Sequence, residues 1–292
     1  MPSRRSPIDL IANVTALDRA AGLVRDAVHK VLQPGAVKNA LHGVWLGHAL
    51  HPALAQMPLG FFTAATALDV IGDQDAAAKR LIGLGIVTSV PAATTGLADF
   101  AEGHEEQQRI GIVHATLNTV ALGCYGASLV QRARGRSGTA SSLLGCVISV
   151  ASAALGGDLI SRHAMGANHA AEVPHTGPDD WHELGLVNDF TTDRPARRMA
   201  GLIPVMVIKQ STGFTVLYDE CSHMAAPLHD GELDTVEGER CIVCPWHGSA
   251  FRVDDGAVVH GPAIAPQPVL DTEIREGVLY AKVRTFAGVP AS

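Results

Sequence analysis

The chain has 292 residues, of which 47% are hydrophobic, 4% aromatic and only 17% charged, with a net charge of −7. This length suits two domains, and the acidic balance, with no basic block longer than "RARGR", excludes nucleic acid as an expected partner. The five cysteines are an odd number in a long chain, which argues against a secreted disulfide framework. The low share of charge is typical of chains with membrane-spanning segments.

Residues 1–40 are predicted to form an amphipathic helical segment. Between positions 7 and 33, apolar residues recur at helical spacing, namely Leu10, Val14, Leu17, Val24, Val28 and Leu32. Pro34 and Gly35 then end the pattern. Such a helix is expected to lie along the membrane surface or against the bundle that follows.

Four apolar stretches lie within residues 41–165, at 50–71, 81–98, 110–130 and 141–160. Each has about 18–22 residues, which at 1.5 Å per residue crosses roughly 30 Å of hydrocarbon. They are rich in Ala, Gly, Ser and Thr, which allow helices to approach closely in a membrane. An all-α four-helix transmembrane bundle is therefore predicted. The alternative is a soluble helical domain with buried helices.

A polar linker punctuated by Gly and Pro is expected at residues 166–182, and the pattern changes after it. Residues 183–286 contain short β-branched runs such as "IPVMVIK" and "RCIVCP", separated by Asp-Gly, Glu-Gly and Thr-Gly dipeptides. This spacing predicts a small all-β sandwich or barrel, with hairpin turns at "DDGAVV" and "REGVLY". The predicted fold class is thus multidomain, an all-α membrane bundle followed by an all-β domain.

Two short clusters in the second half each offer one Cys and one His, Cys221-x-His223 in "CSHMAAPL" and Cys244-x-x-His247 in "CPWHGSAF". Two sulfur and two nitrogen ligands suit tetrahedral zinc. Zinc sites, however, usually take two Cys from one loop and two His from another. A [2Fe–2S] centre with two thiolates on one iron and two imidazoles on the other needs each loop to reach both irons, and this favours a cluster.

The residues around these clusters resemble the Rieske family. "CSHMAAPLHDGEL" and "CPWHGSAFRVDDGAVVHGPA" look like its two cluster-binding boxes, and "GPAIAP" looks like its third loop, over about residues 183–284. The resemblance implies a [2Fe–2S] cluster with Cys221 and Cys244 on the inner iron and His223 and His247 on the outer iron. It also implies a set of residues around the cluster, which are Trp246, Ser249, Phe251, Pro262 and Ala263.

The chain departs from the high-potential branch of that family. This branch has one further Cys in each box, whereas Ala226 and Trp246 stand here, so a disulfide across the cluster is not expected. Phe251 replaces a Tyr whose hydroxyl bonds a ligand sulfur, although Ser249 matches the hydrogen-bonding Ser. With fewer donors to the sulfurs, the potential is predicted in the lower part of the range of about −150 to +300 mV. Cys241 is expected to be a strand residue.

The resemblance implies a membrane-anchored protein that carries single electrons between a redox partner and a second acceptor. A Rieske oxygenase is not expected, because 45 residues follow His247 in this sequence and a catalytic iron domain needs far more. Two alternatives stay open. One is a membrane oxidoreductase that binds haem or quinone and uses the cluster as a relay, and the other is a non-catalytic redox sensor.

The first half resembles the DUF2231 family of predicted four-span membrane proteins over about residues 40–165, in "LHGVWLGHALHPALAQMPLG", "RIGIVHATLN" and "TGLADF". The topology is expected to gather six polar residues near one membrane face, namely His48, His51, Asp99, His114, Asp158 and His163. They are either solvated and structural, or they form a haem b or quinone site. For haem, His51 and His114 are the expected axial pair.

Charges near the spans disagree about the orientation in the membrane. Lys79, Arg80 and "RARGR" mark the first and third loops as cytoplasmic. The N-terminal segment carries six basic residues that resist translocation, which are Arg4, Arg5, Arg19, Arg25, Lys30 and Lys38. A cluster domain without a disulfide also fits a reducing compartment. We expect a multi-pass plasma-membrane protein with its termini and cluster domain in the cytoplasm; the oligomeric state is left open.

Overall fold

The computed structural model describes residues 7–284. The chain divides into two compact units, and each is described by itself. The first unit comprises the chain up to residue 33 together with residues 49–165. The second comprises residues 34–48 together with the chain from residue 166 onward.

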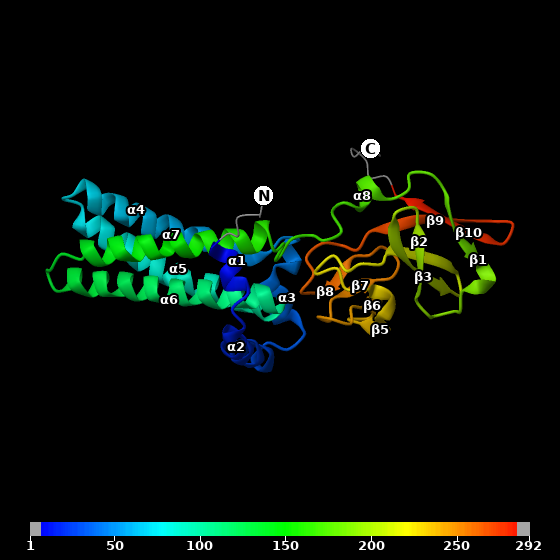
Figure 1. Ribbon diagram of the computed structural model, residues 1–292, viewed down its shortest axis with the longest axis horizontal. Coiled ribbons are helices and arrows are strands. Elements are labelled where there is room, and N and C mark those ends of the chain that lie inside the picture. The colour runs from blue at the N-terminus through cyan, green and yellow to red at the C-terminus, as the bar shows by residue number, and fades with distance from the viewer. Residues whose placement is uncertain (1–6, 285–292) are drawn as a thin grey trace. The chain divides into compact units, whose positions relative to one another are not determined.

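The first unit is built on four long helices that run alongside one another (Figure 1). They are α4 (Leu50–Ile71), α5 (Asp75–Ala101), α6 (Glu105–Ala133) and α7 (Thr139–Ser161). Both α5 and α7 pack against both α4 and α6, so the four helices form a closed bundle. Within residues 7–284, these four are long and apolar enough to cross a membrane. The predicted all-α four-span bundle is confirmed.

Small residues let the helices of the bundle approach closely. A side chain on Gly85 would lie 2.4 Å from the ring of Phe62, and one on Gly145 would lie 3.0 Å from the ring of Tyr125. The two rings stack with their centroids 3.8 Å apart. Close backbone contact and ring stacking therefore fill this core, as van der Waals packing between membrane helices requires.

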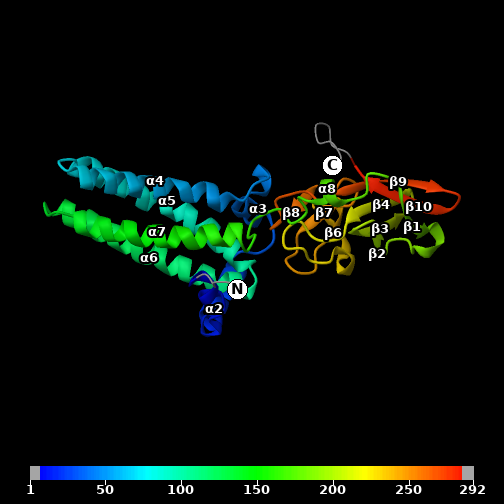
Figure 2. The same cartoon turned by 45° about the horizontal axis from the view of Figure 1, so that its top comes forward.

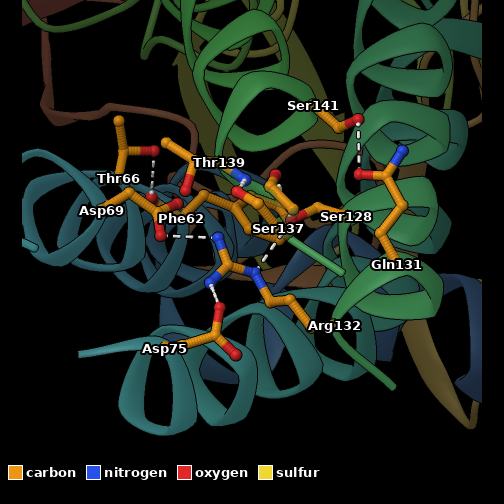
Figure 3. Close-up of polar contacts among 11 residues, drawn as sticks. Phe62, Thr66, Asp69, Asp75, Ser128, Gln131, Arg132, Ser137, Thr139 and Ser141 are labelled. Carbon is orange, nitrogen blue, oxygen red and sulfur yellow. Dashed lines mark hydrogen bonds and ion pairs between the residues drawn. The ribbon is translucent and has the colours of Figure 1, made fainter. Parts of the chain in front are cut away.

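A buried cluster of charged side chains connects the helices at one end of the bundle (Figure 3). The Arg132 guanidinium, with its side chain 1% exposed, pairs with Asp69 at 2.5 Å and with Asp75. It also donates to the Ser128 hydroxyl at 3.2 Å, which in turn donates to the Gly138 carbonyl at 2.8 Å. One arginine thus ties α4, α5 and α6 to the loop that precedes α7.

The N-terminal segment is not one helix over residues 7–33, and that prediction is wrong. It forms α1 (Pro7–Ala12), a 3-10 turn and α2 (Asp18–Val31). Arg109 of α6 holds the break, because its guanidinium donates to the Ala12 carbonyl at 2.9 Å and to Asp18 at 2.6 Å. These tertiary contacts bring α1 against α6 and α2 against α5 and α6.

The second unit contains two antiparallel sheets within the described residues (Figure 2). The six-stranded sheet has the order β1-β10-β9-β4-β3-β2, and the four-stranded sheet has the order β5-β6-β7-β8. The strands are β1 (His182–Leu186), β2 (Ala196–Ala200), β3 (Ile203–Gln210), β4 (Gly213–Tyr218), β5 (Glu232–Val236), β6 (Glu239–Val243), β7 (Ala250–Arg252), β8 (Val258–His260), β9 (Val269–Arg275) and β10 (Val278–Val283). The predicted all-β domain is confirmed.

Turn residues fix the register of these sheets. Glu276 and Gly277 connect β9 to β10 with φ values of 51° and 79°, as a two-residue turn at "REGVLY" requires. Residues 253–257 of "DDGAVV" and its flanks form a longer connection between β7 and β8. The expected linker also packs on the domain, since it contains α8 (Val173–Thr176) and its Val173 belongs to the core beside the six-stranded sheet.

Residues 34–48 pack with the second unit, although they precede the first span in the sequence. They form α3 (Ala36–His42) and a 3-10 turn, Val44–Leu46. A second core of this unit joins Met206 and Leu217 of the six-stranded sheet to Ile242 and Phe251 of the four-stranded sheet. Cys221 and Cys244 belong to the same core, which places the predicted ligand loops at its edge.

Candidate metal centre

The two predicted ligand loops share one backbone design. The first loop connects β4 to β5, and the Cys221 amide donates to the Ala226 carbonyl at 2.8 Å while the Ala225 amide donates back to Cys221 at 2.8 Å. The second connects β6 to β7. There the Cys244 amide donates to the Ser249 carbonyl at 2.8 Å, and the Gly248 amide donates back to Cys244 at 3.1 Å. Each loop is therefore a tight turn with a Cys at its start.

Both cysteine sulfurs face backbone amides and each other. The Cys221 sulfur accepts hydrogen bonds from the amides of His223 and Met224. The Cys244 sulfur accepts from the amides of Trp246 and His247. Both cysteines are buried, and a hydrogen bond from the Cys221 thiol lowers the pKa of the Cys244 thiol to about 7. This setting stabilises a thiolate, which is the form that binds iron.

The two histidines lie together beside the sulfurs. The His223 and His247 rings have centroids 5.0 Å apart and planes at 90°. The His223 Nδ1 atom is buried and has no hydrogen-bond partner among residues 7–284, and the His247 Nδ1 atom is buried as well. Burial, followed by the neighbouring His247, lowers the pKa of His223, so its imidazole is held neutral, as a metal ligand must be.

The arrangement suits two metal ions better than one. Tetrahedral zinc needs four ligands around one point. A [2Fe–2S] centre needs two thiolates for one iron and two imidazoles for the other, and the paired sulfurs and paired rings have that division. The residues present therefore fit a [2Fe–2S] cluster.

The residues predicted around the cluster lie at the same loops. The buried Ser249 hydroxyl accepts a hydrogen bond from the Ala263 amide at 3.0 Å, which ties the second loop to the third loop beside Pro262. Phe251 is fully buried, whereas Trp246 is 50% exposed and meets the His247 ring edge-on at 6.3 Å.

The five cysteines do not pair. All of them are free in the structure, including Cys241 within β6, which confirms that residue as a strand residue. Ala226 and Trp246 occupy the positions of the additional cysteines, so the loops are held without a disulfide. Backbone hydrogen bonds and side chains carry that task instead.

Gln267 contributes several of the hydrogen bonds that hold the first ligand loop, and this role was not anticipated from the sequence. Its side chain is 1% exposed, accepts from the Ser222 amide at 3.0 Å, and donates to the Tyr218 and Glu220 carbonyls at 2.7 Å each. These bonds fix the first ligand loop to the third loop. The only sequence signal is a glutamine between two prolines in "PQP", which does not by itself indicate burial.

Ala225 adopts a left-handed conformation, with φ at 57°, inside the first ligand loop. A Cβ in this region costs about 1–2 kcal/mol. Replacing Ala225 by Gly is expected to stabilise the second unit by about 0.5–1 kcal/mol, after the larger entropy of Gly in the unfolded chain is subtracted. The thermal unfolding midpoint of the purified protein measures this. The neighbouring Ala226, buried and outside the left-handed region, is the control, and Ala226→Gly should destabilise. Equal losses for both variants would contradict the assignment of strain to Ala225.

In the bundle, His51 and His114 have matching environments. Their Nδ1 atoms lie 2.8 Å from the carbonyls of Ala92 and Ser152, each on the next helix. Each ring lies against a glycine, because a Cβ on Gly96 would be 2.8 Å from the His51 ring and a Cβ on Gly156 would be 3.1 Å from the His114 ring. Each imidazole is thus oriented by the neighbouring helix of its own hairpin.

The second ring nitrogen of His114, Nε2, has a hydrogen-bond partner on its own helix. Asn118 lies one turn further along α6, and its side-chain amide is 3.0 Å from His114 Nε2. A ligand at that nitrogen would have to displace Asn118.

The other four bundle candidates have different settings. Asp158 pairs with Arg162 at 3.0 Å and with His163 at 3.4 Å, and Arg162 also pairs with Asp9 of α1. This network has a structural role at the end of α7. Asp99 is partly buried in α5, whereas His48 is exposed and belongs to the second unit.

Comparison with known proteins finds matches for both halves of the chain. A family model for the Rieske [2Fe-2S] domain matches residues 180–285, and one for a predicted membrane protein (DUF2231) matches residues 47–169. The anthranilate 1,2-dioxygenase ferredoxin subunit of Burkholderia cepacia is 32% identical over 104 residues, which cover 36% of this chain and 93% of that protein. Ferredoxin CarAc of Metapseudomonas resinovorans is 36% identical over 102 residues, which cover 34% of this chain and 91% of that protein.

A solved structure is similar over a comparable share of the chain. It is the complex of reduced oxygenase and oxidized ferredoxin in carbazole 1,9a-dioxygenase, with 30% identity and a TM-score of 0.32, covering 36% of this chain and 94% of that chain. The two ferredoxins match this chain over more than nine-tenths of their own lengths. The chain therefore belongs to the Rieske [2Fe–2S] family, and a DUF2231-type membrane domain precedes its Rieske domain.

Proposed function

We propose that this protein is a membrane-anchored electron carrier whose cluster is bound by Cys221 and Cys244 at the inner iron and by His223 and His247 at the outer iron. The division of the site into a sulfur pair and an imidazole pair supports this most strongly. A bound Rieske cluster accepts and releases one electron at a time. The protein supplies the backbone amides that face the sulfurs and, by burial, holds the His223 imidazole neutral.

Electron exchange with a protein partner is proposed to occur at the edge formed by His247 and Trp246. The half-exposed indole offers a flat apolar contact next to a ligand ring, and aromatic side chains are favoured at protein interfaces. The two ferredoxins named above are small carriers by their names, which supports a reductase or oxidase as partner here. The buried Phe251 has no hydroxyl to donate to a sulfur, which supports a potential in the lower part of the Rieske range.

The four apolar helices support a multi-pass position in the plasma membrane. We further propose that the termini and the Rieske domain face the cytoplasm, because a ligand site held without disulfides suits a reducing compartment. A cysteine introduced on the surface of the C-terminal domain tests on which side of the membrane this domain lies. A membrane-impermeant thiol reagent should label it in inverted vesicles and not in intact cells.

Electron transfer is tested in native membranes that contain the full-length protein. Addition of NADH under argon is expected to produce the EPR signal of a reduced two-iron cluster, and air is expected to remove it. Membranes with a Cys244→Ser variant provide the blank. A signal that appears with dithionite but with none of NADH, succinate or reduced quinone would contradict an electron carrier and favour a redox sensor.

A haem or quinone site in the bundle is the second candidate. Its support is that both His51 and His114 have Nδ1 directed to a backbone carbonyl, the arrangement that orients metal-bound histidines. Haem at this pair predicts a Soret band that both His51→Ala and His114→Ala abolish, and Asn118→Ala should leave or strengthen it. Purified protein without a Soret band, or with one that survives both substitutions, would contradict haem ligation by this pair.

A further inference from the structure

The two hairpins of the bundle, α4–α5 and α6–α7, share one sequence pattern. Residues 51–69, "HPALAQMPLGFFTAATALD", align without a gap on residues 114–132, "HATLNTVALGCYGASLVQR". Residues 81–100 of α5 align in the same way on residues 141–160 of α7. The identical pairs include His51 and His114, Gly60 and Gly123, Gly85 and Gly145, and Gly96 and Gly156. This pattern indicates an internal duplication of one helical hairpin.

The two hairpins also share their internal contacts. The carbonyls of Ala92 and Ser152, which lie 2.8 Å from the two histidine Nδ1 atoms, belong to aligned residues. Gly96 and Gly156, one turn further along each helix, lie against the same two histidine rings. Each copy of the sequence therefore holds its histidine in the same way.

Equivalent residues of the two hairpins meet each other at two levels of the bundle. Phe62 and Tyr125 are aligned, and their rings stack with the centroids 3.8 Å apart. Asp69 and Arg132 are aligned, and they form the buried ion pair at 2.5 Å (Figure 3). In an arrangement with two-fold symmetry, a residue touches its own equivalent only close to the axis. A pseudo-two-fold axis therefore runs between α4 and α6.

The two equivalent histidines differ at the second ring nitrogen. His114 Nε2 is 3.0 Å from the side-chain amide of Asn118. The residue aligned with Asn118 is Ala55, which has no polar side chain, and His51 Nε2 has no hydrogen-bond partner among residues 7–284. At one of two equivalent places the protein satisfies this nitrogen itself. At the other it does not, which points to a partner from outside the chain.

The orientation of the His51 ring defines the chemistry of that partner. The ring is partly buried, lies against Gly96 and donates its Nδ1 hydrogen to the Ala92 carbonyl. In the neutral imidazole the other nitrogen, Nε2, then carries a lone pair and accepts a hydrogen bond. A ligand that binds here from the membrane must therefore supply a donor group.

We propose that the duplicated bundle keeps one ligand site, at His51, and that this site binds a quinol whose hydroxyl group donates a hydrogen bond to His51 Nε2. The inference rests on the proposed function, because quinols are membrane-soluble molecules that carry electrons and also have a hydroxyl hydrogen to donate. The corresponding quinone has only carbonyl acceptors in place of these hydroxyl groups. The site therefore binds the reduced form through a contact that the oxidised form cannot make.

Binding of a short-chain ubiquinol to the full-length protein in detergent, measured under argon with the cluster reduced by dithionite, tests the proposal. His51→Leu is expected to weaken quinol binding about tenfold, which is the contribution of one hydrogen bond. Binding of the matching ubiquinone, measured with air-oxidised protein, should be unaffected by the same substitution.

The duplication supplies matched variants for this experiment. Ala55→Asn gives His51 the asparagine that His114 has, so it should weaken quinol binding at least as much as His51→Leu does. It also keeps the proposal testable if His51→Leu does not fold. Asn118→Ala removes the asparagine from the other hairpin, and this variant should bind the quinol at least as tightly as the wild type.

Four results would overturn the inference. They are a wild-type protein that binds no quinol, quinol binding that survives both His51→Leu and Ala55→Asn, equal effects of His51→Leu on quinol and quinone binding, and a Soret band that requires both His51 and His114. Failure of the proposed function is a separate result, since it would appear as wild-type protein without any cluster signal in EPR.

Discussion

Replacing Cys244 by Ser is expected to remove the cluster, with iron falling from about two atoms per chain to nearly none. The Cys244 sulfur is buried, accepts amide hydrogen bonds from Trp246 and His247, and has its pKa lowered to about 7. Serine keeps the size of the side chain but not the soft thiolate that iron–sulfur clusters require. Iron and acid-labile sulfide per chain, together with visible absorbance, measure the loss.

Cys241 provides a matched control for this variant. It lies three residues earlier in the chain, is fully buried in β6 and pairs across the sheet with Asp234 and Arg252. Cys241→Ser should therefore retain the cluster, with a modest loss of stability from the buried hydroxyl. If Cys241→Ser lost the cluster and Cys244→Ser kept it, the assignment of ligands would be wrong.

Replacing Arg132 by Met is expected to destabilise the bundle by about 3–5 kcal/mol, because it leaves a buried charge without its partner. The Asp69 side chain is 3% exposed and lies 2.5 Å from the Arg132 guanidinium, so it cannot be solvated when the arginine is removed. The loss should appear as a lower unfolding midpoint for the helical signal of the detergent-solubilised protein.

Two further variants distinguish the loss of the buried ion pair from a general disruption of the bundle. Arg134→Met removes an exposed arginine two residues further along and should have little effect. Adding Asp69→Leu to Arg132→Met removes the stranded carboxylate and should recover much of the stability. Equal destabilisation by Arg132→Met and Arg134→Met would show that the ion cluster does not hold the helix ends together.

The four spans and the strands were predictable because their signals are local. Long stretches poor in charge predict membrane helices, and the Glu-Gly dipeptide at 276–277 predicts a turn whose positive φ values are found. The break in the N-terminal segment was not predictable. It depends on Arg109, about 90 positions later in the chain, bonding both Ala12 and Asp18, and helical periodicity carries no information on such contacts.

The predicted ligands were visible for the same reason, since Cys-x-His and Cys-x-x-His patterns lie within single turns. The contacts that hold those turns in place could not be predicted from the sequence. Gln267 is buried where it bonds the first ligand loop, because the Ser222 amide, 45 positions earlier in the chain, donates to its side chain. Contacts between distant segments decide which polar residues become functional.

The most direct test of this account is pulsed EPR of the anaerobically purified full-length protein after reduction with dithionite. The account predicts the spectrum of a mixed-valence two-iron cluster, with hyperfine coupling to two imidazole nitrogens that is lost in the histidine-ligand variants. It also predicts about two acid-labile sulfides per chain, as a [2Fe–2S] centre contains. A colourless protein with one zinc per chain and no acid-labile sulfide would contradict it.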